Sequence, residues 1–338
     1  MFWLRLRQLI FEQRLSDKLS GRVFEHKPGE VVFSAYRYKS GQKMKAIILV
    51  AGATGDLGGR IVHALLERGA VVRALVRPAS DSEKVEKLAK AGVQIVKVNE
   101  WNVAELSVAC QGVACVVSAL QGLHDVIVGA QSALADAAVG SGVPRFIPSD
   151  FASDLTQVAP GENRNFDLRR EFHKYLDKCP IQTTSVLNGA FAELLQYNIP
   201  FLNFKAKTVA YWGSVYHKVD FTTKDNTAAF TAAAALDPTA PGILRIAGFQ
   251  ISATEMAAMA SEILHTTFTI TNMGSCADLS AFNKCERAAH PEGENEVFPG
   301  WQRSQYTHSM FSTRLEPLDN SRYPGIHWTG LRELLTAR

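Results

Sequence analysis

The chain has 338 residues, of which 46% are hydrophobic, and its 36 Lys and Arg against 33 Asp and Glu give a formal net charge of +3. This size and apolar content suffice for a large core in one domain or two closely packed ones. Residues 1–43 carry a net charge of +5, so the rest carries −2 and offers no basic surface of the kind that binds nucleic acid. No run approaches 18 apolar residues, which excludes a membrane span.

The five cysteines are odd in number and include no Cys-x-x-Cys pair. This usage indicates a reducing compartment, which we take to be the cytoplasm, without a disulfide framework or a structural metal. Residues 1–43 contain an amphipathic stretch around Arg5, Arg7 and Arg14, which is compatible with an organelle-targeting segment. Because Glu12 and Asp17 interrupt that stretch, we favour an extension outside the core fold.

From Met44 onward, strand-like and helix-like segments alternate. A capping box at Ser80–Glu83 predicts the start of a helix that ends at Lys90. Such alternation predicts right-handed crossovers and a doubly wound parallel sheet in an α/β protein. The expected strands are 45–51, 71–76, 93–98, 113–118 and 145–148, and the other expected helices are 58–68, 103–110 and 124–139.

Beyond Asp150 the alternation loosens, and we expect a smaller α+β lobe that packs directly on the sheet. We therefore divide the chain into an extension (1–43), a dinucleotide-binding domain (44–155) whose sheet is completed by later strands, and a substrate-binding lobe with the tail (156–338). Helices are expected at 166–176, 224–236 and 254–264, and strands at 182–187, 208–211, 215–221 and 244–247.

A glycine motif, V-A-G-A-T-G-D-L-G, joins the first strand to the first helix. A strand, three glycines spaced by two residues, and a helix together predict a dinucleotide site. Gly52 permits the tight turn, Gly55 lets the backbone approach a pyrophosphate, and Gly58 lets the helix pack closely on the strand. We expect Thr54 and Leu57 of the same loop to contact the cofactor as well. The phosphates would meet free N–H groups at the positive end of the helix dipole.

The tip of the second strand distinguishes between the two nicotinamide cofactors. An NAD site usually has an acid there that binds the ribose 2′-OH, whereas this strand ends in Arg77 and has no acid before Asp81. A guanidinium can hold a 2′-phosphate bidentately. The sequence therefore favours NADP(H) over NAD, with Arg77 as the phosphate ligand; an exposed arginine without this role is the alternative.

Four segments together resemble the NmrA-like branch of the atypical short-chain dehydrogenases, which includes the isoflavone-reductase-like enzymes. They are G-A-T-G-D-L-G, V-R-A-L-V-R-P, G-V-A-C-V-V-S and R-F-I-P-S-D-F. The resemblance covers roughly residues 44 to 265. It implies a Rossmann domain, NADPH use, a cofactor that runs along Ala119 and Leu120, and a nicotinamide near Ser149 and Asp150. It also implies that 188–191 lines the far wall of the cleft.

The Tyr-x-x-x-Lys pair of ordinary short-chain dehydrogenases is absent. In the reductases of the family that this chain resembles, a lysine stands at the position of Arg169. Arginine cannot exchange a proton at neutral pH, but it can hold a developing oxyanion. His173 lies one helical turn further on and titrates near neutrality, so it is our candidate acid. The alternative is that both residues belong to an ordinary charged helix surface.

Two functions remain open from the sequence. The first is an NADPH-dependent reductase of a small aromatic, quinone-like or phenylpropanoid-like substrate. The second is a non-catalytic NAD(P)-binding redox sensor like the regulatory proteins of the family. The expected partner is a small molecule, and the oligomeric state is left open.

Overall fold

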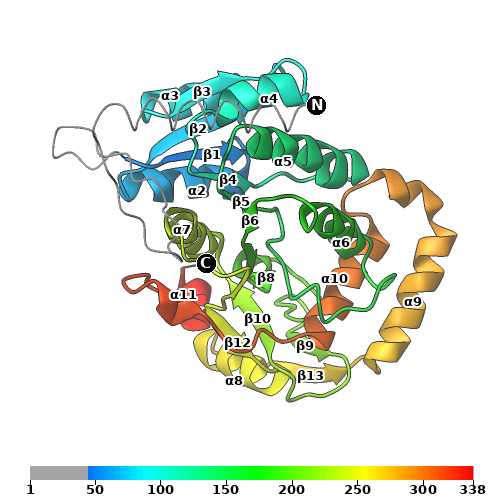
Figure 1. Cartoon of the computed structure of the whole chain (residues 1–338). Helices are drawn as coiled ribbons and strands as arrows, with labels where there is room; N and C mark the ends of the chain where they lie inside the picture. The colour runs from blue at the N-terminus through cyan, green and yellow to red at the C-terminus, as the bar shows by residue number, and fades with distance from the viewer. Residues whose placement is uncertain (1–44, 338) are drawn as a thin grey trace, which may run out of the picture. The chain divides into compact units, whose positions relative to one another are not determined.

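The computed structural model describes residues 45–337, so the predicted extension lies outside the described residues. A six-stranded parallel sheet with the order β3-β2-β1-β4-β5-β6 organises the first half (Figure 1). The predicted doubly wound α/β fold is confirmed, and each of its five expected strands is present. The bounds are β1 Ile47–Ala51, β2 Val71–Val76, β3 Gln94–Lys97, β4 Cys115–Ser118, β5 Arg145–Ile147 and β6 Gln182–Thr183.

Helices cover both faces of this sheet. On one face, α2 (Asp56–Glu67) and α7 (Lys224–Leu236) share a buried apolar cluster that includes Ile61, Leu65 and Phe230. On the other face, a second cluster joins the sheet to α4 (Val103–Cys110), α5 (Gln131–Gly140) and α6 (Arg164–Leu176). The crossover from β2 to β3 contains α3 (Ser82–Lys90).

Later segments complete the first half. Strand β6 pairs with β5, and after Thr184 the chain continues as β7 (Ser185–Leu187), which pairs in parallel with β11 (Ile243–Arg245). These elements and α7 all come from beyond residue 155, and β6 is the one among them that joins the six-stranded sheet.

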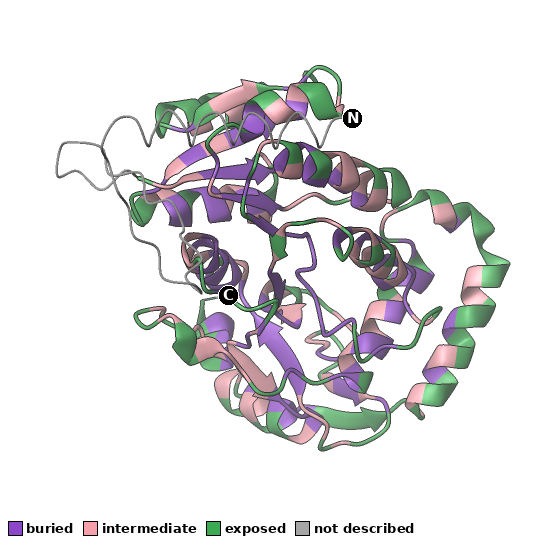
Figure 2. Ribbon diagram, viewed as in Figure 1, coloured by how far each residue is buried: buried purple, intermediate pink, exposed green. Residues whose placement is uncertain are grey.

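The remainder of the chain forms short elements around a separate apolar cluster that includes Phe201, Phe221 and Phe311. The elements are a mixed sheet of β12 (Phe249–Ile251), β10 (Val219–Thr222) and β8 (Ala190–Phe191), a parallel pair of β13 (Thr269–Asn272) and β9 (Thr208–Tyr211), and helices α8 (Ala253–Ile263), α9 (Cys276–Ala289), α10 (Gly300–Ser312) and α11 (Leu331–Thr336). Buried residues fill the inner strands β1, β4 and β10, whereas β13 is exposed along its whole length and α9 over most of its length (Figure 2).

Three local predictions are corrected by the structure. The capping box at Ser80 is wrong, because the Asp81 carboxylate caps α3 by accepting from two N–H groups, while Ser80 Oγ accepts from the Arg77 N–H. The expected continuous helix 124–139 begins instead with a π-helical segment, Asp125–Ala130. The expected strand 215–221 is only Val219–Thr222, since the chain before it follows the turn after Gly213.

Candidate functional site

The glycine loop has two positions where the surrounding backbone leaves no room for a side chain. Gly52 has φ +82°, and a Cβ there would lie 2.5 Å from the Ala119 carbonyl oxygen. A Cβ on Gly58 would lie 2.1 Å from the Gly52 carbonyl oxygen. The loop therefore packs directly on the chain after β4, which brings Gly52 and Ala119, two of the expected cofactor-binding residues, together.

Gly55 differs from its two neighbours in the motif. It is exposed, has an ordinary φ of −76°, and a Cβ on it would meet only the Gly52 carbonyl oxygen, at 3.1 Å. Gly55 is also the N-cap of α2, and no side chain caps this helix among the described residues. Side chains cap six other helices, namely Asp81, Asn102, Asn163, Thr223, Ser252 and Ser275 on α3, α4, α6, α7, α8 and α9, whereas α5, α10 and α11 also begin without a side-chain cap. The bare start of α2 suits an anion such as a pyrophosphate.

An acidic side chain, Asp56, stands in the first turn of α2 and would oppose a bound phosphate. Lys224 Nζ lies 2.5 Å from Asp56 Oδ2, and Arg60 Nε lies 2.8 Å from Oδ1. These hydrogen bonds, first that from Lys224 and then that from Arg60, lower the pKa of Asp56 below its usual value. The carboxylate is thus compensated locally, and the helix terminus remains suitable for a phosphate.

The other predicted contacts of the loop lie near the same sheet edge. Thr54 and Leu57 are half-buried, and Arg77 is exposed directly after β2. Strand β2 is the parallel neighbour of β1, so Arg77 and the glycine loop follow the carboxyl ends of adjacent strands. In open α/β sheets this edge is where ligands bind.

Ser149, which follows β5, joins three elements through three different groups. Its N–H donates to Gln131 Oε1 at 3.1 Å, and its hydroxyl donates to the Leu120 carbonyl oxygen at 2.7 Å. Its carbonyl oxygen accepts from Arg169 Nε at 2.9 Å. The structure therefore brings the predicted residues Leu120, Ser149 and Arg169 together.

Asp150 is 1% exposed and pairs with the predicted acid. His173 Nε2 lies 2.7 Å from Asp150 Oδ2, which also accepts from Ser185 Oγ at 2.7 Å. Burial alone raises the pKa of Asp150, but His173, Ser185 and Arg169 together hold it below the usual value. Burial likewise lowers the pKa of His173, but Asp150 outweighs this and leaves it above the usual value. Each partner therefore favours the charged form of the other.

Arg169 contacts the main chain on two sides. Besides the Ser149 carbonyl oxygen, its Nη1 donates to the Asn165 carbonyl oxygen at 2.8 Å. A guanidinium has five N–H donors, so three remain for another group. Arg169 thus combines a structural contact to Ser149 with spare capacity for an oxyanion.

Several buried polar atoms at the carboxyl edge of the sheet have no hydrogen-bond partner among residues 45–337. They are Ser118 Oγ at the end of β4, Asp150 Oδ1 after β5, and both amide atoms of Asn188 after β7. Buried polar groups are normally satisfied, so each such group calls for a water or a ligand. Ser118 and Asp150 follow the adjacent strands β4 and β5, and this position fits a site for a polar cofactor head.

Two residues at this edge were missed from the sequence. Gln131 is 1% exposed and starts α5, and Ser185 lies in β7. A glutamine in an otherwise alanine-rich helix is the only sequence signal that marks Gln131, while nothing distinguishes Ser185 from other strand serines.

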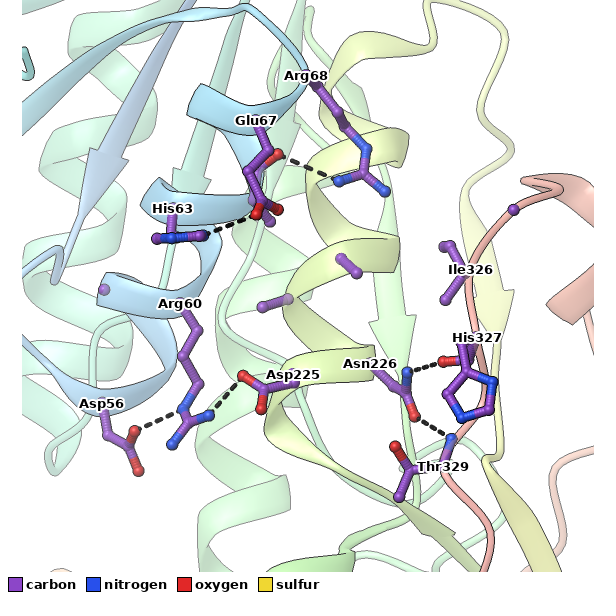
Figure 3. Close-up of a pocket in the computed structure, with 15 residues that line it drawn as sticks. Asp56, Arg60, His63, Glu67, Arg68, Asp225, Asn226, Ile326, His327 and Thr329 are labelled. Atoms are coloured by element: carbon purple, nitrogen blue, oxygen red, sulfur yellow. Dashed lines mark hydrogen bonds and ion pairs between the residues drawn. The ribbon is translucent and has the colours of Figure 1, made fainter. Parts of the chain in front are cut away.

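A cavity of about 890 Å³ lies elsewhere, between α2, α7 and residues 325–329 (Figure 3). Its polar side chains pair with one another: Arg60 Nη1 lies 2.5 Å from Asp225 Oδ1, and Asn226 exchanges hydrogen bonds with the main chain of His327 and Thr329. None of the predicted site residues lines it. Within residues 45–337, no cluster of metal-ligating side chains occurs, and no helix is both long and apolar enough to cross a membrane.

Known proteins share the sequence pattern and the fold. Pinoresinol reductase 1 of Arabidopsis thaliana is 33% identical over 211 residues, which are 57% of this chain and 66% of that protein. A bifunctional pinoresinol-lariciresinol reductase of Linum usitatissimum is 29% identical over 197 residues, 54% of this chain and 63% of that protein. The chain thus spans just under two thirds of the length of these relatives.

Solved structures extend the likeness of fold over more of the chain. AtPrR2 with NADP+ and (+)pinoresinol superposes with a TM-score of 0.69 at 23% identity, covering 88% of this chain and 99% of that one. An isoflavone reductase superposes with a TM-score of 0.70 at 20% identity, covering 87% and 99%. The model of the NmrA-like family matches residues 44–273. The chain therefore belongs to the NmrA-like family.

Proposed function

We propose that this protein is an NADPH-dependent reductase of a phenylpropanoid-like or other small aromatic, quinone-like substrate. The observation that carries the proposal is the bare start of α2 after a loop in which Gly52 packs on Ala119 and Gly58 packs on Gly52. The named relatives support it, because pinoresinol reductases act on an aromatic compound of this class and AtPrR2 is recorded with NADP+.

The described residues fit the cofactor. Gly52, Thr54, Gly55, Leu57 and Gly58 would hold the pyrophosphate, and the unpartnered polar atoms at the carboxyl edge of the sheet suit a polar head group. Bound NADPH supplies a hydride. Arg77 would hold the 2′-phosphate, while Ala119, Leu120, Ser149 and Asp150 would line the rest of the site.

Arg169 and His173 would have different roles at the substrate oxygen: Arg169 would stabilise its negative charge, and His173 would donate a proton to it. Arg169 stays protonated and offers its remaining N–H groups to the negative charge that develops there. Although burial lowers the pKa of His173, Asp150 raises it above its usual value, which favours the protonated form that would supply the proton. Since Nε2 is engaged by Asp150, Nδ1 is the atom that would release the proton.

A second candidate function is an NAD(P)-binding redox sensor without turnover. Arg169 favours it, because a guanidinium replaces the family's lysine and already binds two main-chain carbonyls. Titration with NADPH, followed by absorbance at 340 nm with pinoresinol, quinones and aromatic carbonyls, separates the two. Consumption of NADPH supports the reductase; binding without consumption for any of these compounds supports the sensor.

A further inference from the structure

Ser149 and Gln131 form a chain of three hydrogen bonds that spans one loop. Ser149 Oγ donates to the Leu120 carbonyl oxygen at 2.7 Å, and the Ser149 N–H donates to Gln131 Oε1 at 3.1 Å. Gln131 Nε2 then donates to the Ile127 carbonyl oxygen at 2.7 Å. We call this arrangement the Gln131–Ser149 bridge; it ties together the two ends of residues 120–127.

The bridged segment has little internal regularity of its own. It includes the start of the π-helical segment Asp125–Ala130, a rare geometry that often occurs at functional sites. Gly122 folds against this segment so closely that a Cβ on it would lie 2.5 Å from the Val126 side chain. The segment is thus compact, and the Gln131–Ser149 bridge connects both its ends to the residue that follows β5.

Gln131 is suited to this task because it is 1% exposed and uses both ends of its amide. An apolar residue there would leave the Ser149 N–H and the Ile127 carbonyl without their partner, which a buried site tolerates poorly. Because Ser149 is only 5% exposed, water can replace the lost hydrogen bonds only if residues 120–127 move away from Ser149.

We propose that Gln131 is a positioning residue for the cofactor: through Ser149 it holds the Leu120 segment in the conformation that binds NADPH. This inference rests on the proposed function, in which Leu120 and Ser149 line the cofactor. A loop that occupies its competent conformation only part of the time weakens apparent affinity by that fraction. Gln131 therefore acts on NADPH affinity without touching the cofactor.

The test uses Gln131→Met, which keeps the size of the side chain and removes both hydrogen bonds. We expect the Kd for NADPH to rise roughly tenfold, with KM for NADPH rising in parallel and kcat changing less than twofold. Ser149→Ala removes only the bond to Leu120 and should also weaken binding. The double variant should bind NADPH no more weakly than whichever single variant binds it more weakly, because both substitutions act through the Gln131–Ser149 bridge.

The matched control is Gln302→Met on α10. Gln302 is also fully buried, and its Nε2 donates to Asn163 Oδ1 at 2.9 Å, but it lies outside the site. The Gln302→Met substitution should lower the melting temperature and leave the Kd for NADPH unchanged. An unchanged Kd in Gln131→Met, at a melting temperature lowered as in Gln302→Met, overturns the positioning role.

Hydrogen exchange separates failure of this inference from failure of the proposed function. Amides of 120–127 should exchange faster in cofactor-free Gln131→Met than in wild type; unchanged exchange overturns the bridge whether or not NADPH binds. If wild-type protein binds NADPH but reduces none of the substrates, the proposed reductase function is overturned. The Kd for NADPH of Gln131→Met compared with wild type then still tests the positioning role. Wild-type protein that binds no NADPH overturns both the proposed function and the cofactor role of Gln131.

Discussion

The carboxyl edge of the central sheet and the packing of α9 on α10 both bury polar side chains, but with different results. At the sheet edge, Ser118 Oγ, Asp150 Oδ1 and the Asn188 amide lack partners, beside a helix start that no side chain caps. Buried Arg164, at the start of α6, donates to four main-chain carbonyls of residues 293–297, which link α9 to α10, and stacks 4.7 Å from the Trp301 ring centre.

The contrast teaches which buried polar groups indicate a ligand. Asn283 and Gln302 Oε1 also lack partners among the described residues near α9 and α10, so an unpartnered atom alone is weak evidence. What distinguishes the sheet edge is its backbone, where Gly52 and Gly58 allow contacts of main chain on main chain next to open N–H groups. Open donors and room for close approach, rather than buried polarity, mark a phosphate site.

The largest effect should come from the Arg164 side of this comparison. Arg164→Met removes a charged donor from four carbonyls, and we expect the free energy of unfolding to fall by about 3–5 kcal/mol. Denaturant titration measures this. The Kd for NADPH should stay within twofold of wild type, and a parallel loss of affinity would show that the two regions are coupled.

At the sheet edge, Arg169→Ala should reduce turnover by roughly 10²–10³-fold while NADPH affinity stays nearly intact, as expected for loss of an oxyanion donor. Arg169→Lys should keep much of the activity, because the family pattern has lysine there. Steady-state kinetics on one accepted aromatic substrate measures both variants. If Arg169→Ala turns over as fast as wild type, Arg169 has only a structural role, through its contacts with Ser149 and Asn165.

The glycine loop itself can be tested with a pair of variants. Gly58→Ala places a Cβ 2.1 Å from the Gly52 carbonyl oxygen, so the backbone must shift and stability should fall by about 1–3 kcal/mol. In Gly55→Val the Cβ lies 3.1 Å from the Gly52 carbonyl oxygen, a milder contact, so this variant should lose less stability than Gly58→Ala. Gly55→Val should nevertheless weaken NADPH binding at least tenfold, about 1.4 kcal/mol, by crowding the pyrophosphate. Unchanged fluorescence titration of Gly55→Val would remove the loop from the cofactor site.

A smaller change is expected from Arg77→Glu, because Arg77 is exposed and screened by water. The variant should lose affinity for NADPH several-fold more than for NADH, since only NADPH carries the 2′-phosphate. Competition binding with both cofactors measures the ratio. Equal losses for the two cofactors would exclude Arg77 as the phosphate ligand.

The smallest effect concerns the pH dependence of stability. The raised pKa of His173 means that its contribution is complete below the unfolded value of 6.5 and is lost as pH rises through the folded value. The lowered pKa of Asp150 means that its contribution is present above 3.8 and is lost as pH falls through its folded value. Melting temperatures should therefore decline as the pH rises above 6.5 in wild type, and His173→Asn should flatten that decline. An equal decline in both would assign it to other groups.

The sequence predicted the sheet half well because its signals are local. Each strand and helix is a continuous run, and Gly52 and Gly58 stand where the backbone requires them. The C-terminal half was harder because no regular alternation with helices marks its strands, which pair across long separations, as β8 does with β10. Side-chain direction was also hidden: Arg169 and His173 share a helix face, but only the structure shows that one binds Ser149 and the other Asp150.

The packing of α7 on α2 has a consequence for synthesis of the chain. Ile61 and Leu65 of α2 are buried in one cluster with Ala228 and Phe230, which leave the ribosome more than 150 residues later. Until then, a nascent sheet would present an apolar helix face to its surroundings, a state prone to aggregation. Non-local closure of this kind also slows folding. A chain stopped near residue 155 would therefore need a chaperone, even though it carries the whole glycine loop.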